Sequence, residues 1–433
     1  MRKSMLTLST VLSLVLFAGC GSSSEPKVAE SNKTFAVEEK ELDTLATTFF
    51  GDKENNRIIV ADTDEMKLID LVDDLKTGHQ ITYTADKVPG HTKAYVVNRG
   101  SNAIDVVDTQ KFQIVKTIAL DHFPRSAEAM NKTLGLCEVS GMNKAMATII
   151  DTKTDEVVAV VGEDIEVDPK KNQNHGGSHA TGHPYWLDSN HFVLLDRYGR
   201  KIITYEITKD YQDSWIVTKI NELQTPTSIH QLIPRKKSYK GDASLYYATS
   251  EGSDELKPAV LELKFTKCGL EINRAVTLEK DGLSAKEMGI HHGDFHPSKK
   301  EIYIGSKEGN LFVVDYENMK IVKTIQAGKS AGHTMFVPKR NLAIVVNHKD
   351  TFVTIIDTNS DEKIKDVKVS NAEELVGNST IQAHPKYYVS KDGRYFYAFI
   401  TSDGLLYEMD LETLRVTRTL EVGGKPAQGS FVE

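Results

Sequence analysis

Cysteine is scarce in this sequence, and the few cysteines lie far apart. Only three occur in 433 residues, and no CxxC or CxxCH motif is present, so c-type haem attachment is excluded. Apart from Cys20, which belongs to the N-terminal segment, Cys137 and Cys268 fall in nonadjacent repeats. We expect them to be two separate thiols, buried or partly buried, without a disulfide.

Signatures of the common enzyme classes are also missing. The sequence has no GxSxG elbow, no HExxH, no P-loop and no GxGxxG turn opening a helix. The formal net charge of -8 and the pI near 6.0 leave no basic footprint, so nucleic acid is not an expected partner. No second long apolar segment follows the N-terminus, and we expect the body of the protein to be soluble. Binding and delivery are therefore favoured over catalysis.

The N-terminal segment resembles a bacterial lipoprotein signal. A positively charged start leads into a short apolar stretch that ends in Ala18-Gly19-Cys20. We expect residues 1–20 to be the signal, Cys20 to be lipidated, and residues 21–34 to form a flexible tether. This predicts a periplasmic, membrane-anchored lipoprotein that meets the membrane only through its lipid. Gly21, in place of Asp, slightly favours the outer membrane. The alternative is an ordinary signal peptide with an incidental cysteine.

One strand pattern repeats through the rest of the chain, residues 35–433. In each copy, runs of β-branched and aromatic residues flank a polar turn, and a further strand-like run follows. Eight such hairpins begin at Arg57, Ala94, Leu134, Phe192, Ser244, Ile302, Leu342 and Phe396. Their spacing of about 35 to 55 residues is typical of β-propeller blades with four antiparallel strands. The pattern predicts an all-β protein.

The C-terminus predicts how the ring closes. AQGSFVE, from Ala427, has the character of one more inner strand with no blade after it, whereas the hairpin from Arg57 lacks an inner strand before it. We expect the C-terminal strand to complete the first blade, which leaves no exposed sheet edge. The prediction is an eight-bladed propeller, with seven blades as the alternative.

Histidine recurs at one place in the repeat, three residues before a bulky apolar residue. The five copies are His183, His230, His292, His333 and His384. Equivalent positions in a radial array surround one axis, and neutral imidazoles are good ligands for zinc and copper. We therefore predict a metal site formed by a neighbouring subset of these rings. Occupancy is expected to fall as pH drops through about 6.5, the usual imidazole pKa. The alternative is that each histidine only packs and hydrogen-bonds within its own repeat.

Two further groups add candidate ligands. In GIHHGDFHP, strand alternation puts His292, Asp294 and His296 on one face and turns His291 away, so Asp294 is a candidate ligand or a partner of a ligand. The glycine-rich loop between the third and fourth repeats contributes His175 and His179 as ligands or as a lid. His79 is a candidate extension of the series, whereas His91, His122, His191 and His348 are interpreted as satisfied surface or turn residues.

The segments VVNRGSNAIDVVDTQKFQIVKTI, from Val96, and IGSKEGNLFVVDYENMKIVKTI, from Ile304, resemble YVTN-type propeller repeats. Among secreted propellers with several histidines near the axis, the chain resembles periplasmic zinc metallochaperones. That resemblance implies zinc as cargo and the periplasmic solute-binding protein of an ABC metal importer as partner. Two alternatives stay open: a haem d1- or copper-binding redox propeller related to denitrification, and a scaffold propeller without metal.

Overall fold

The repeated strand pattern forms thirty-two strands among the described residues of the computed structural model. The structure describes residues 46–73, 82–168, 177, 179–236, 239–372, 380–384 and 386–433. These residues belong to one compact unit, Leu42–Glu433. The expected signal, the lipidated Cys20 and the tether lie outside the described residues.

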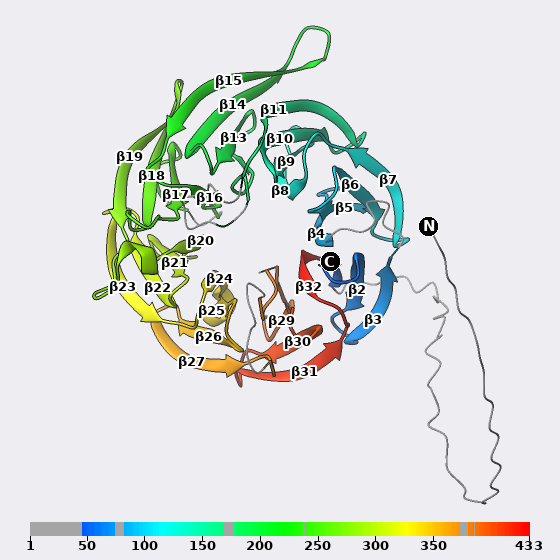
Figure 1. Ribbon diagram of the computed structural model, residues 1–433. Helices are drawn as coiled ribbons and strands as arrows, with labels where there is room; N and C mark the ends of the chain where they lie inside the picture. Colours follow the sequence, from blue (N-terminus) through cyan, green and yellow to red (C-terminus); the bar gives the residue numbers. More distant parts are fainter. Residues whose placement is uncertain are drawn as a thin grey trace, which may run out of the picture. The chain divides into compact units, whose positions relative to one another are not determined.

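The strands form eight four-stranded antiparallel sheets, one for each blade, arranged around a common axis (Figure 1). From the innermost strand outward, blades 1 to 4 are β32 (Pro426–Val432), β1 (Thr47–Asp52), β2 (Arg57–Asp62), β3 (Lys67–Val72); β4 (Thr82–Lys87), β5 (Lys93–Asn98), β6 (Ala103–Asp108), β7 (Gln113–Ala119); β8 (Pro124–Asn131), β9 (Leu136–Gly141), β10 (Lys144–Asp151), β11 (Glu156–Glu166); and β12 (Tyr185–Trp186), β13 (His191–Asp196), β14 (Lys201–Lys209), β15 (Trp215–Gln224). Blades 5 to 8 are β16 (Ile229–Leu232), β17 (Leu245–Ser250), β18 (Ala259–Thr266), β19 (Gly269–Thr277); β20 (Ile290–Phe295), β21 (Glu301–Ser306), β22 (Asn310–Asp315), β23 (Lys320–Gln326); β24 (Ala331–Val337), β25 (Leu342–Asn347), β26 (Phe352–Asp357), β27 (Glu362–Lys368); and β28 (Tyr388–Val389), β29 (Tyr395–Ile400), β30 (Leu405–Asp410), β31 (Arg415–Glu421).

The eight-bladed architecture and its closure are as predicted. The C-terminal strand β32 pairs with β1, with Thr47 opposite Val432, and so completes blade 1. Strand β1, however, was not anticipated. The hairpin from Arg57 therefore supplies the third and outermost strands of its blade, one place further out than in the other repeats.

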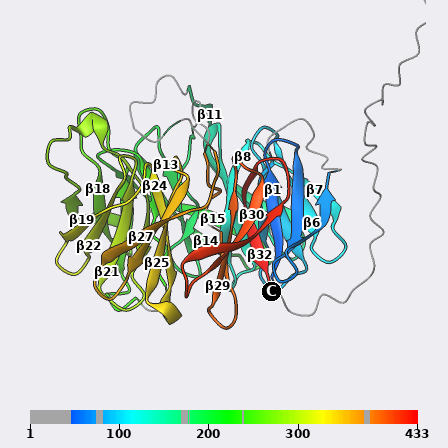
Figure 2. The ribbon, with the colours of Figure 1, turned by 90° about the horizontal axis from the view of Figure 1, so that it is seen from below.

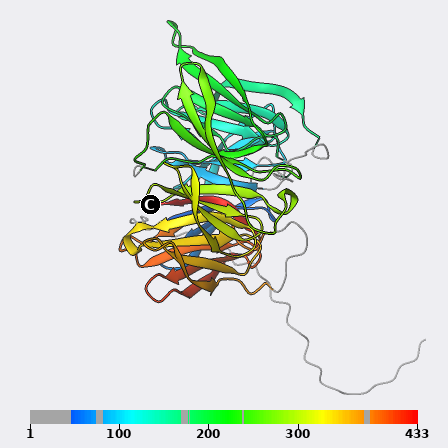
Figure 3. The same ribbon diagram turned by 90° about the vertical axis from the view of Figure 1, so that its left-hand side faces the viewer.

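Apolar packing between neighbouring blades holds the ring together. Eight buried hydrophobic clusters occur in the described part of the chain, one between each pair of adjacent blades. At the closure, Phe50 of blade 1 packs on Phe399 of blade 8 with ring centroids 4.2 Å apart. Side views show the blades standing side by side (Figures 2 and 3), and the β14–β15 hairpin projects beyond the other blades in the view of Figure 1. Because every blade face is covered by the next blade, burial is continuous around the ring.

A β-bulge recurs at the start of the innermost strands. The register with the second strand shifts by one residue in β4, β8, β16, β20, β24 and β32. A bulge places two consecutive residues opposite one, and the extra residue leaves the regular alternation of faces. The bulges therefore alter which side chains face the axis of the ring.

Helical structure is minimal in the residues described. Two short 3-10 turns occur, η2 (Ala285–Glu287) and η3 (Pro338–Arg340). None of the helices in these residues has the length and apolar character needed to cross a membrane.

Candidate metal centre at the propeller axis

Seven histidines of the described part of the chain gather at the inner ends of blades 4 to 8. The seven residues are His183, His230, His291, His292, His333, His348 and His384. Their rings form a continuous chain of contacts, with centroids 4.7 Å apart for His183 and His292, 3.8 Å for His292 and His333, and 5.1 Å for His348 and His384. We call this group the histidine arc.

One end of the histidine arc brings three ring nitrogens together. Ligand atoms of His183, His230 and His292 all lie within 4.8 Å of one another, and the Nε2 atoms of His230 and His292 are 3.1 Å apart. Nitrogens bound tetrahedrally to one zinc ion at 2.0–2.1 Å would be separated by about 3.3 Å. The distance between His230 and His292 is therefore close to the spacing that one ion requires, and a ring nitrogen of His183 lies within 4.8 Å of both.

Polar partners hold the opposite nitrogen, Nδ1, of each ring in the trio. The Nδ1 atom of His183 hydrogen-bonds to the Glu128 carboxylate. That of His230 lies 2.9 Å from Glu251, and that of His292 lies 2.6 Å from the amide oxygen of Gln231. Because all three acceptors are oxygens, each Nδ1 carries the proton and donates it, and the lone pair is left on Nε2. This is the arrangement typical of metal-binding histidines.

Buried charges surround these partners. Arg197 donates to both carboxylate oxygens of Glu251, with Nη2 2.8 Å from each, and both side chains are almost fully buried. Arg125, also buried, lies close enough to His183 to lower the pKa of that imidazole. The trio is thus flanked by two carboxylates and two guanidinium groups of opposite charge.

The environment keeps the histidines of the arc neutral. Burial lowers the pKa of His183 to about 4, an effect that Arg125 reinforces and Glu128 opposes. Burial is also the main cause of the lowered pKa values of His230 and His292, with further lowering by neighbouring imidazoles. A neutral imidazole offers a lone pair, whereas a protonated one repels a cation. These rings are ready to accept a metal near neutral pH.

A buried nitrogen without a hydrogen-bond partner also supports metal binding by this trio. The Nε2 atom of His183 is buried and has no hydrogen-bond partner among the described residues. Leaving a polar atom in this state costs free energy unless something else satisfies it. A group of three imidazoles with ring nitrogens this close suits a zinc or copper ion, which binds imidazole nitrogen well.

Some of the predicted ligands lie in the histidine arc, and others lie outside it. All five repeat histidines belong to the arc. Asp294 does not: its carboxylate accepts the backbone N–H of Thr334 and lies 3.7 Å from Nζ of Lys236. His179 is also outside the trio, because its Nδ1 accepts a hydrogen bond from Arg125. His79 and His175 lie outside the described residues.

Two members of the arc were misassigned from the sequence. His291, expected to turn away, contacts His230 with ring centroids 4.0 Å apart, because the bulge between Ile290 and Gly293 interrupts the alternation of β20. His348, interpreted as a satisfied surface or turn residue, does lie in the turn after β25, but it is buried beside His384. The HisHis dipeptide was a usable signal for the first. No local signal marked the second.

Other expectations are corrected in the same way. His296 faces away from the arc and packs on Phe336, with both ring nitrogens hydrogen-bonded to backbone groups. His122 is satisfied as expected but fully buried, between Phe123 and Thr148. Cys137 is a buried free thiol as expected, whereas Cys268 is exposed.

A further set of clustered groups, outside the arc, has a structural explanation. His296, Glu301 and Asp361 lie within metal-binding distance of one another. Asp361, however, already accepts hydrogen bonds from Lys299 and Tyr303 of the preceding blade. An equivalent contact joins Tyr95 of blade 2 to Asp155 of blade 3. This set therefore belongs to a repeated contact between blades.

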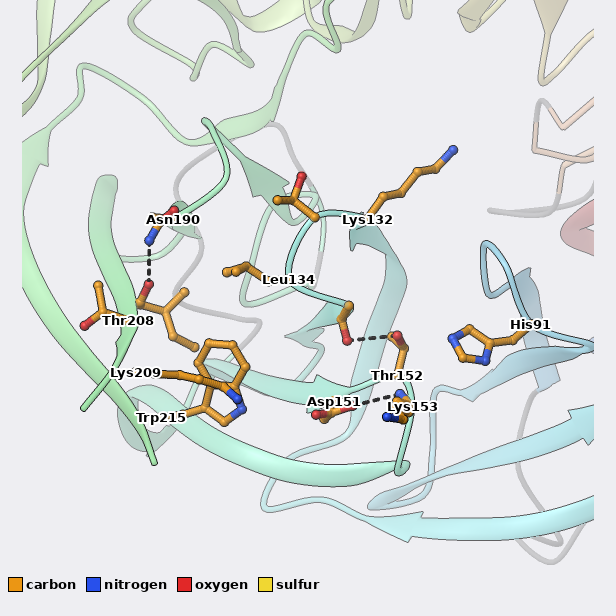
Figure 4. Close-up of a pocket in the computed structure, with 13 residues that line it drawn as sticks. His91, Lys132, Leu134, Asp151, Thr152, Lys153, Asn190, Thr208, Lys209 and Trp215 are labelled. Atoms are coloured by element: carbon orange, nitrogen blue, oxygen red, sulfur yellow. Dashed lines mark hydrogen bonds between the residues drawn. The ribbon is translucent and has the colours of Figure 1, made fainter. Parts of the chain in front are cut away.

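A surface pocket of about 750 Å³ lies away from the arc, among loops of blades 2 to 4 (Figure 4). Its lining includes His91, Asp151 and Trp215. His91 is in a turn, as expected, and the Asp151 carboxylate accepts the backbone N–H of Lys153. A single histidine and a carboxylate that already accepts a hydrogen bond do not form a metal site. The histidine arc is therefore the candidate metal centre.

Comparison with known proteins identifies the fold. No protein-family model matches the chain, and no curated protein shows significant sequence similarity to it. Among solved structures, the dihydro-haem d1 dehydrogenase NirN in complex with DHE is similar, with 14% identity, coverage of 91% of this chain and 76% of NirN, and a TM-score of 0.65. AztD of Citrobacter koseri has 12% identity, 90% and 98% coverage, and a TM-score of 0.58. Sqt1 of Saccharomyces cerevisiae has 11% identity, 80% and 87% coverage, and a TM-score of 0.59. At these identities the likeness establishes a β-propeller fold alone.

Proposed function

We propose that this protein binds a transition-metal ion, zinc in the first place, through Nε2 of His183, His230 and His292, and delivers it to a partner protein. The observation that carries the proposal is the convergence of three neutral imidazoles whose Nδ1 atoms are all held by oxygen acceptors. Three protein ligands leave the fourth tetrahedral position of zinc open. A ligand from a partner can enter there, which suits an ion that is cargo.

The charges around the trio also suit release. Glu128 and Glu251 favour a bound dication, but Arg197 neutralises Glu251 and Arg125 adds positive charge close to His183. Repulsion between the arginines and the ion weakens binding compared with a site that has carboxylates alone. This balance favours an ion that is held but can be passed on.

The proposed cellular setting follows the sequence. The protein would be a periplasmic lipoprotein anchored through Cys20, with the outer membrane slightly favoured. Its partner would be the solute-binding protein of an ABC metal importer, in line with the resemblance to periplasmic zinc metallochaperones. Copper is the alternative cargo, because imidazole nitrogen suits it equally well.

The test is metal analysis of protein purified from the periplasm without an affinity tag. We expect zinc in the wild-type protein, and its loss from the trio in H183A/H230A. The matched control is His191→Ala, because His191 is a partly exposed histidine that pairs with Asp188 outside the arc. Wild-type protein without metal, even after incubation with zinc or copper, would refute the proposal. A visible absorption spectrum of the same sample would reveal a bound haem d1 instead.

A further inference from the structure

The other end of the histidine arc contains a second group of three histidines. Ligand atoms of His333, His348 and His384 all lie within 4.8 Å of one another. Their ring centroids are 5.2 Å apart for His333 and His348, 5.2 Å for His333 and His384, and 5.1 Å for His348 and His384. None of the three belongs to the trio described above, and blades 7 and 8 supply all of them.

Two nitrogens of this second group are buried without a partner. Among the described residues, Nε2 of His333 and Nε2 of His348 make no hydrogen bond. The Nδ1 atom of His348 lies 3.4 Å from the carbonyl oxygen of Gln382, so the proton is placed on Nδ1 and the lone pair on Nε2. Buried polar atoms without a partner are costly, and an ion bound by these imidazoles would remove that cost.

The backbone makes space for one of these rings. A Cβ atom on Gly332 would lie 2.3 Å from Cδ2 and 2.4 Å from Nε2 of His348, far below van der Waals contact. Gly332 precedes His333 at the bulge of β24. Only glycine allows the imidazole of His348 to lie against the backbone there. Gly332 therefore leaves space for the His348 ring next to His333, the repeat histidine of the same blade.

We propose that His333, His348 and His384 form a second metal-binding position, distinct from the trio of His183, His230 and His292. The second position takes the same class of ion and so rests on the proposed function. The described residues place no carboxylate in hydrogen-bond contact with His333 or His348, whereas carboxylates support two rings of the first trio. Since each bound dication also repels another, the second ion binds more weakly than the first. The arc then offers two neighbouring positions between which an ion can pass.

The experiment is a zinc titration of the full chain purified without an affinity tag, followed by calorimetry and by metal analysis after gel filtration. Wild-type protein is expected to bind two zinc ions in two resolved steps. Gly332→Ala, which displaces the ring of His348 without removing any donor, should bind one, and H348A should do the same. H183A/H230A should also bind one ion, at the weaker position.

A control variant and a test of folding distinguish failure of the second metal position from failure of the first. Gly289→Ala is the matched control, because its Cβ would meet only the flexible side chain of Lys307, at 3.0 Å. Thermal unfolding shows whether each variant is folded. One zinc ion in the wild type, unchanged in G332A and H348A, would overturn the second position and leave the first intact. Loss of both ions in H348A would show a single shared cluster and would also overturn it. No zinc in any variant would overturn both proposals.

Discussion

Removing the carboxylate behind His183 should weaken metal binding without touching a ligand. The Glu128 side chain accepts the Nδ1–H of His183, and its own pKa is held below the usual range by His183, Lys386 and Arg125 despite burial. It is therefore ionised, orients the ring, and adds negative charge behind it. Loss of such a partner typically costs 10- to 100-fold in metal affinity, or about 1.4–2.7 kcal/mol. We expect a loss in this range for Glu128→Ala.

The conservative variant separates orientation from charge. Glu128→Gln keeps an oxygen acceptor for the Nδ1–H of His183 but has no charge, so its loss should be smaller than that of Glu128→Ala. Competition with a chromophoric zinc chelator at pH 7 measures both. Glu138→Gln is the control. Glu138 is a buried carboxyl whose pKa is raised well above its ordinary value by burial, and among the described residues its side chain accepts a hydrogen bond only from the backbone N–H of Tyr185. Equal zinc affinity for wild type and Glu128→Ala would refute the reasoning.

Three further predictions concern stability. Burial lowers the pKa of His183 to about 4, while unfolded histidines titrate near 6.5. Protonation therefore favours the unfolded chain in this window, and the metal-free protein should lose up to about 1.4 kcal/mol per pH unit for each such histidine as pH falls from 6.5 toward 4. Urea unfolding checks this, and equal stability at pH 7 and pH 5 would count against it. Arg197→Ala leaves Glu251 buried without its guanidinium and should cost roughly 3–5 kcal/mol in chemical denaturation, so a loss below 1 kcal/mol would be inconsistent with the buried pair. Gly429→Ala should lower the thermal midpoint well below that of Gly289→Ala, because its Cβ would lie 1.9 Å from a backbone oxygen of β1 and open the ring closure; equal midpoints would contradict this.

Much of the fold could be read from the sequence because each blade repeats a local pattern. Alternating apolar residues and polar turns define hairpins within short stretches of chain, and the residual strand at Ala427 indicated how the ring closes. The missed strand β1 shows the limit of this approach. The sequence of Thr47–Asp52, TTFFGD, has only two apolar residues, side by side, so it shows neither the alternation of a half-buried strand nor a longer apolar run, although the strand is buried at every position.

The candidate site was predictable only where its residues share a place in the repeat. The five recurring histidines do converge. His291 lies in the arc because of the bulge in β20, and His348 lies there because Gly332 leaves space for its ring. A repeating sequence pattern reveals neither of these features. Glu128 and Glu251 were missed because each meets its histidine across a large separation in sequence. Contacts of this kind depend on how blades pack, which a repeat pattern does not specify.

The most direct test of the account is anomalous X-ray diffraction at the zinc edge from crystals of untagged protein incubated with zinc. We expect a strong anomalous peak about 2.0–2.1 Å from Nε2 of His183, His230 and His292. A peak bound elsewhere on the propeller, with these three nitrogens vacant, would contradict it.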